Sequence, residues 1–161
     1  MQIRGVRLIS AFAAAALAPA CILTAWYLYD QFIRFEADDP YIWIRTRTVS
    51  LLFLALSTLH VVVLGIPCYI VLRWRNALHA RSVLVSGFAL GAIPGAIVSW
   101  PMQYAGTQYS SVINGVTMIA DGVTTTAGWM RFFSGILFLG LCGLSGATMF
   151  WLVKQSRREA L

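Results

Sequence analysis

The sequence predicts an all-α integral membrane protein, a single domain over residues 1–161 built as a four-helix bundle with a short extra helix between the third and fourth spans. Hydrophobic residues make up 59% of the chain and charged residues only 11%, whereas soluble domains carry about 25% charge. The mean hydropathy is +0.74. Four stretches lack Asp, Glu, Lys and Arg, and each is close to the roughly 20 residues that cross a bilayer as a helix. They are 8–29, 49–72, 82–100 and 132–153.

The same composition excludes several classes of protein. A soluble domain of 161 residues could not bury this much apolar surface. Three cysteines are too few, and odd in number, for a disulfide-stapled secreted module. The net charge of +6 does not indicate nucleic-acid binding, because the basic residues form small clusters beside apolar runs, where they orient a protein in the lipid bilayer.

The distribution of these charges predicts that both termini are cytoplasmic. The N-terminal segment, the connection between the second and third spans, and the C-terminal segment hold eight Lys/Arg and one acid, Glu159. The other two connections hold four Arg and five acids. An excess of Lys and Arg in short loops marks the cytoplasmic side. The eight are Arg4, Arg7, Arg73, Arg75, Arg81, Lys154, Arg157 and Arg158.

The first span, 8–29, is expected to be a membrane helix. Its early part resembles a signal peptide, with small residues at Ala18-Pro19-Ala20 followed by Cys21. The apolar run continues through 22–29, however, and so reaches full spanning length. A cleaved signal peptide is the alternative.

Small residues within the spans predict close packing between helices. Because lipid provides no hydrophobic attraction between helices, small side chains must allow them to approach. Packing within one chain is expected, and a homo-oligomer or partner interface is the alternative. Prolines at positions 19, 67 and 94 predict kinks. The packing glycines are Gly87, Gly91 and Gly95 in the third span and Gly140, Gly143 and Gly146 in the fourth.

The connection between the third and fourth spans, 101–131, is the most unusual segment outside the spans. It is long and carries only two charges, Asp121 and Arg131. Its apolar residues recur at a helix-like spacing, which predicts a short helix at the outer membrane surface or dipping into the bundle. Asn114-Gly115 and Asp121-Gly122 are turn signals that would bound or break this helix, and Asn114 and Asp121 are candidate functional residues. The apolar residues are Val112, Ile113, Val116, Met118 and Ile119.

His60 is the chemical candidate inside the spans. An ionisable side chain at membrane depth suggests a functional site, and a hydrogen bond across the bundle is the structural alternative. Other chemistry is missing. A bis-histidine haem or a zinc site needs more ligands than the spans offer, and Cys21, Cys68 and Cys142 lie in different spans without a C-x-x-C pattern. We therefore expect no metal, no cofactor and no catalytic residue.

Three segments resemble a family of small four-span bacterial inner-membrane proteins of uncharacterised function. They run from His60 to Pro67, from Ser82 to Pro94, and from Asn114-Gly115-Val-Thr on to Thr126-Ala-Gly-Trp129. The resemblance covers the second span onward. It implies the four-helix fold and a bacterial inner membrane, and it brings no activity and no catalytic residues.

These observations favour a non-enzymatic inner-membrane protein that binds a partner in or at the membrane. It could be an accessory subunit of a larger complex or an immunity-type protein that blocks a membrane-acting toxin, and self-association is a related possibility. A small oligomeric transporter or channel that uses His60 is the alternative. A lipid-modifying enzyme with His60 or Asp121 as base is the weakest of the three, because no nucleophile or metal accompanies the base.

Overall fold

The computed structural model describes residues 2–34 and 39–155, and the side chains of residues 6–33 and 39–155. Within these ranges the predicted all-α, four-helix architecture is confirmed. Some of the charged residues that predict the membrane orientation lie outside the described residues or side chains. They are Arg4, Arg34, Glu36, Asp38, Arg157, Arg158 and Glu159.

Five α-helices make up the four long helical stretches. They are α1 (Gln2–Arg34), α2 (Ile42–His60), α3 (Ile66–Trp74), α4 (Ala80–Val98) and α5 (Thr126–Gln155). A single π-helical turn, η1 (Val61–Gly65), joins α2 to α3, so the two form one continuous stretch. The stretches long and apolar enough to cross a membrane are Val6–Ile33, Ile42–Trp74, Ala80–Tyr104 and Thr126–Gln155.

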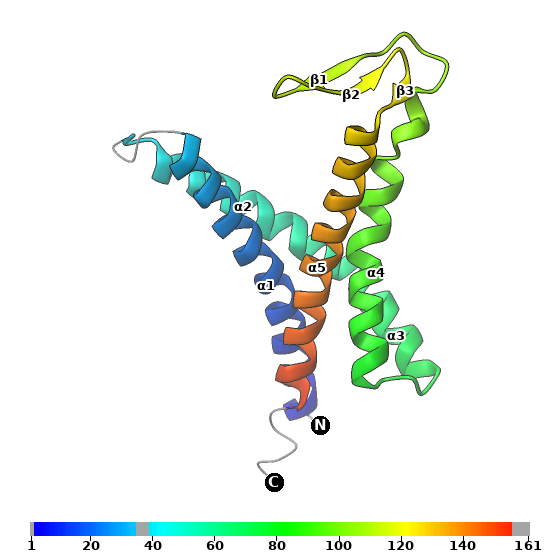
Figure 1. Ribbon diagram of the computed structural model, residues 1–161. Coiled ribbons are helices and arrows are strands. Elements are labelled where there is room, and N and C mark those ends of the chain that lie inside the picture. Colours follow the sequence, from blue (N-terminus) through cyan, green and yellow to red (C-terminus); the bar gives the residue numbers. More distant parts are fainter. Residues whose placement is uncertain (1, 35–38, 156–161) are drawn as a thin grey trace.

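Helix α5 is the centre of the arrangement. It contacts α4 along one side and α1 along another, and α1 in turn contacts α2. Within the described residues, α2 contacts neither α4 nor α5. Figure 1 shows the consequence: the α1–α2 pair splays away from the α4–α5 pair toward the end that carries the strands. The start of α1, the end of α5 and the α3–α4 connection lie at the opposite end.

The α4–α5 contact depends on glycine backbones that touch. A Cβ built on Gly143 would collide with the carbonyl oxygen of Gly87, and one on Gly91 would collide with the carbonyl oxygen of Leu139. Two further glycines of this pair of helices meet side chains: Gly95 lies against Leu139 and Gly140 against the ring of Phe88. Glycine at these positions lets the two helices approach at backbone distance.

The α1–α5 contact uses alanine in the same way. A Cβ on Gly146 would lie 2.7 Å from the carbonyl oxygen of Ala15, which is too close for any larger side chain. Closer to the start of α1 and the end of α5, the rings of Phe12 and Phe150 pack with their centroids 5.0 Å apart. The alanines of α1 that are buried in this part of the core are Ala11, Ala15, Ala16 and Ala20.

The π-helical turn η1 comes just before Pro67, which lies at the start of α3. Proline has no N–H to donate, and its ring would clash with a carbonyl one turn earlier in a regular α-helix. A wider π-turn relieves such a conflict, and π-turns often occur at functional sites. The predicted kink at Pro67 therefore takes the form of a widened turn directly after His60.

The connection between α4 and α5 differs from the sequence prediction. A short 3₁₀ helix, η2 (Pro101–Tyr104), follows α4, but the residues predicted to be helical form β-strands. The strands are β1 (Ser111–Ile113), β2 (Val116–Ala120) and β3 (Val123–Thr124), and they form an antiparallel sheet in the order β1-β2-β3. The prediction of a helix over Val112–Ile119 is therefore wrong.

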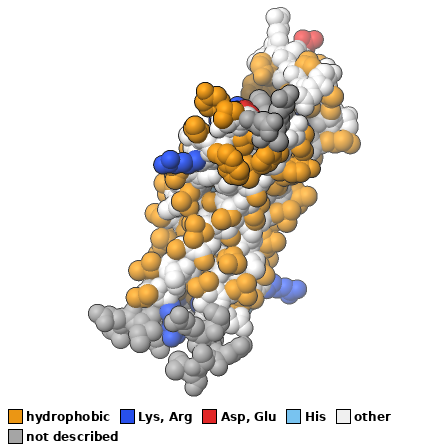
Figure 2. All heavy atoms as spheres, turned by 90° about the vertical axis from the view of Figure 1, so that its left-hand side faces the viewer, with side chains coloured by type: hydrophobic (Ala, Val, Ile, Leu, Met, Phe, Trp, Pro, Cys, Tyr) orange, Lys and Arg blue, Asp and Glu red, His pale blue; other side chains and the backbone are white. Residues whose placement is uncertain are grey.

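Figure 2 looks onto the face on the α1–α2 side of the molecule. Hydrophobic side chains cover its middle, and Lys and Arg side chains lie toward its ends. None of the residues in the hydrophobic window of Ile42–Trp74 is buried inside the protein. A helical surface of this kind is suited to an apolar surrounding such as lipid.

Candidate functional site

An apolar groove runs between the α2–α3 stretch and α4. Its volume is about 460 Å³, within the range of roughly 300–1,000 Å³ typical of ligand sites. Helices α1 and α5 form its floor, where Pro19 and Gly146 lie. The groove exists because α2 does not reach α4. Its polar lining residues are Ser57, His60, Cys68, Tyr69, Ser86 and Cys142.

His60 lies at the middle of this groove, on the last turn of α2. Its side chain is half-buried and lines the groove together with Ser57 and Val61. Ser57, one turn earlier, donates a hydrogen bond from Oγ to the carbonyl oxygen of Ala16 on α1 (2.7 Å). That bond joins α2 to α1 one turn before His60. No described residue forms a hydrogen bond with the imidazole.

The groove holds little reactive chemistry. Cys68 and Cys142 line it, and the three cysteines are free thiols. No group of three or more His, Cys, Asp or Glu side chains comes together anywhere among the described residues. The groove is therefore a largely apolar surface with one imidazole, one phenol and a few hydroxyls.

Aromatic rings pack together along the inner part of the groove. Tyr69 of α3 packs edge-on against Phe12 of α1 at 5.6 Å and against Phe150 of α5 at 5.7 Å. The ammonium of Lys154 lies 5.7 Å from the centroid of the Tyr69 ring and 5.4 Å from that of Trp151. This cluster brings α3 back to α1 and α5, so the splayed halves are joined at the inner end.

The three-stranded sheet lies beyond the ends of α4 and α5 (Figure 1). Its two turns are Asn114-Gly115 and Asp121-Gly122, the dipeptides that the sequence marked as turn signals, and all four residues have positive φ. In the first turn φ is 51° at Asn114 and 77° at Gly115, and in the second it is 48° at Asp121 and 78° at Gly122. These are the values of type I′ turns, whose twist suits two-residue hairpins.

Asn114 and Asp121 therefore occupy structural turn positions outside the helices. Asn114 forms the tip of the β1–β2 hairpin, where Ile113 pairs with Val116. The backbone N–H of Asp121 donates to the Oγ of Ser110 (2.9 Å), and Gly122 donates its N–H to the carbonyl oxygen of Tyr109 (2.8 Å). The structure places neither residue near His60, so the three candidates do not form one site.

The sheet is tied to the start of α5 by Thr125. Its hydroxyl lies 2.7 Å from the carbonyl oxygen of Thr117 and 3.0 Å from that of Met118, and it accepts a hydrogen bond from the N–H of Gly128 (3.2 Å). The last of these bonds is an N-cap for α5. A Cβ on Gly128 would collide with the carbonyl oxygen of Met118, so glycine allows the strand to lie against the helix.

Each strand of the sheet exposes a valine. The exposed fractions are 61% for Val112, 48% for Val116 and 70% for Val123. The outer edge of β1 has no strand paired with it among the described residues. Because the segment 101–131 has only the charges of Asp121 and Arg131, this surface is almost neutral as well as apolar.

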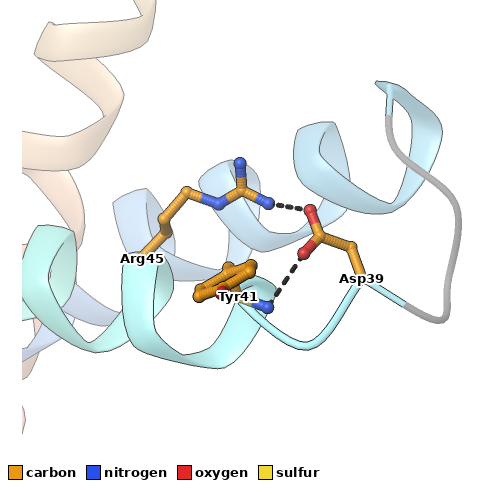
Figure 3. A network of polar contacts seen from close by, with 3 residues as sticks. All are labelled: Asp39, Tyr41 and Arg45. Atoms are coloured by element: carbon orange, nitrogen blue, oxygen red, sulfur yellow. Dashed lines mark hydrogen bonds and ion pairs between the residues drawn. The ribbon is translucent and has the colours of Figure 1, made fainter.

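A polar network marks the start of α2 at the same end of the molecule. The carboxylate of Asp39 accepts a hydrogen bond from the backbone N–H of Tyr41 (2.9 Å) and forms an ion pair with Arg45 (Figure 3). The first of these contacts closes an Asx-type turn ahead of the helix. This turn leads directly into the first residues of α2.

No family model matches the chain, and neither does a curated protein or a solved structure.

Proposed function

We propose that the protein is a non-enzymatic multi-pass membrane protein that acts by binding a membrane-protein partner, as an accessory subunit or as an immunity-type protein. The observation that carries this proposal is the apolar surface of the three-stranded sheet. Exposed valines on the helices need no explanation beyond lipid, whereas Val116 and Val123 lie beyond the helix ends. These two share one face of the sheet, because Val123 pairs with Ala120 and alternate residues of β2 share a face. An apolar patch outside the spans marks a surface that another molecule covers.

The sheet also offers the backbone of a free edge strand. Such an edge presents unpaired N–H and C=O groups, to which a partner can add an extended segment. The stacked rings of Tyr104 and Tyr109, with centroids 4.4 Å apart, and the bonds of Thr125 hold this surface in one shape. A surface that is ordered in advance loses less conformational entropy when a partner binds.

The proposed location is a bacterial inner membrane, with both chain ends and the α3–α4 connection in the cytoplasm. Three arginines, Arg73, Arg75 and Arg81, lie in or beside that connection and no acid does, which supports this orientation through the excess of positive charge in cytoplasmic loops. The resemblance to four-span inner-membrane proteins supports the same location. The sheet would then face the periplasm.

Site-specific photo-crosslinking in native membranes tests partner binding. A photoreactive residue replaces Val123 on the sheet in one variant and Val85 in the other, a residue of α4 that is 64% exposed. We expect a discrete protein adduct from position 123 and lipid adducts alone from position 85. An adduct of twice the 17.8 kDa chain mass would identify a second copy as the partner. The same pattern from both positions would contradict the proposal.

A transporter or channel is the second candidate, and the position of His60 is the observation in its favour. The imidazole lines the groove beside a π-turn and Pro67, and both ionisable groups at membrane depth and π-turns often occur at functional sites. Flux into liposomes separates the two functions. Flux that depends on pH and is lost in His60→Ala would establish transport, and equal leakage with and without the protein would exclude it.

A further inference from the structure

The inner end of the groove lies next to a group of basic residues, which we call the inner basic rim: Arg73, Arg75 and Arg81. The groove lining reaches the α3–α4 connection at Leu72, Leu78 and Val83, which are close neighbours of these arginines in the chain.

The connection between these residues folds back on the end of α3. The backbone N–H of Ala77 donates to the carbonyl oxygen of Leu72 (2.9 Å). Arg73, Arg75 and Arg81 are exposed, and within the described residues no carboxylate pairs with any of them. The apolar groove therefore ends beside three arginines that form no ion pair with a carboxylate of the described residues.

The shape of the groove favours a flexible occupant over a helix. The walls are apart where α2 faces α4, but η1 and α3 both contact α4 farther along. A helix with its side chains is about 10–12 Å wide and cannot pass where the walls touch. A hydrocarbon chain can follow the lining from Leu23 and Phe53 toward Leu72 and Leu78.

We infer that the groove holds an acyl chain of an anionic phospholipid, with the lipid phosphate bound at the inner basic rim. The lining matches the hydrocarbon chain, and the guanidinium groups match the phosphate, which arginine binds through two parallel hydrogen bonds. Basic pockets between helices on the cytoplasmic side are a recognised form of lipid site. This inference goes beyond partner binding, because the groove and the sheet are separate surfaces.

Native mass spectrometry of the detergent-purified chain tests the headgroup part of the inference. Phosphatidylglycerol and phosphatidylcholine are the probes and are titrated separately. We expect one phosphatidylglycerol molecule to bind about tenfold more tightly than phosphatidylcholine. The double variant R73Q/R81Q should lose most of this preference. The control R47Q/R131Q removes the same charge from exposed residues at the other end and should keep the preference.

The acyl-chain part is tested by filling the groove. Ser86 lines it, and its neighbour Val85 does not, so Ser86→Phe should abolish binding of both probes while Val85→Phe leaves it unchanged. If Ser86→Phe does not fold, the comparison of R73Q/R81Q with R47Q/R131Q still tests the inference, because these variants change only exposed side chains.

Three results would overturn the inference: equal affinity for the two lipids, equal loss in the two double variants, or a second copy of the chain in place of lipid. Crosslinking from Val123 is measured on the same variants. It should persist in R73Q/R81Q, so failure of lipid binding and failure of partner binding are distinguishable.

Discussion

At the scale of single residues, glycine has two different roles in this molecule. In α4 and α5, Gly87, Gly91 and Gly143 allow backbone contact, whereas Gly115 and Gly122 allow positive φ in turns. Gly135 does neither, because nothing lies within 4 Å of the Cβ position on it. The small size of these residues within the predicted spans suggested the first role, and dipeptide context suggested the second.

The helix contact predicts a large difference between two glycine substitutions. Gly91→Leu should push α4 away from α5, because its Cβ would collide with the Leu139 carbonyl oxygen, and it should lower the free energy of unfolding by about 1–3 kcal/mol. Gly135→Leu should be neutral or slightly stabilising, since leucine favours helix over glycine. Unfolding in detergent, followed by circular dichroism, measures both. Equal destabilisation would contradict the packing described for Gly91.

The left-handed backbone at Asp121 predicts which substitutions the second turn accepts. Asp121→Asn should keep the sheet, because Asn tolerates positive φ, whereas Asp121→Val should destabilise the turn by about 1–2 kcal/mol. Hydrogen exchange of the amides in β2 and β3 measures the difference. Crosslinking from Val123 should survive Asp121→Asn, and its loss would show that the carboxylate itself acts in binding.

At the scale of elements, the outer sheet is where sequence and structure disagree. Spacing of apolar residues over Val112–Ile119 fits a short helix, but a segment this short is ambiguous between helix and strand. The turn chemistry was more informative than the spacing. Asn-Gly and Asp-Gly between apolar segments are strong signals for two-residue hairpins, and the intervals between them leave room only for short strands.

Thr125 predicts how strongly the sheet depends on α5. Thr125→Val keeps the shape of the side chain but removes its contacts with the Thr117 and Met118 carbonyls and its N-cap bond to Gly128. We expect a loss of about 0.5–2 kcal/mol and faster hydrogen exchange over 111–124. The control is Thr126→Val at the exposed neighbouring position. Unchanged exchange in Thr125→Val would mean that the sheet is held by other contacts.

At the scale of the whole molecule, the four helices could be predicted from charge-free stretches, while the groove could not. Each predicted stretch lies largely within a helical stretch, and all four helical stretches begin before the predicted start. The groove depends on the angle between the α1–α2 and α4–α5 pairs, and no local pattern encodes that angle. His60 was found because it is ionisable, but its place opposite α4 required the fold.

The orientation predicts which side of the membrane each connection faces. With Cys21, Cys68 and Cys142 replaced by alanine, Thr117→Cys on the sheet should react with a membrane-impermeant maleimide in intact cells. His79→Cys in the α3–α4 connection should react only after the membrane is made permeable. Both positions are exposed. The reverse pattern would show that the chain is threaded in the opposite direction.

The central claim is that a protein partner covers the outer sheet, and crosslinking from position 123 with and without Val116→Asp tests it most directly. Val116 lies on the same face of the sheet as Val123, because Val123 pairs with Ala120 and alternate residues of β2 share a face. It is 48% exposed, so an aspartate there should leave the fold intact while placing an unpaired charge in the interface. We predict a discrete protein adduct that falls sharply with Val116→Asp. Lipid adducts alone, unchanged by the substitution, would contradict the account.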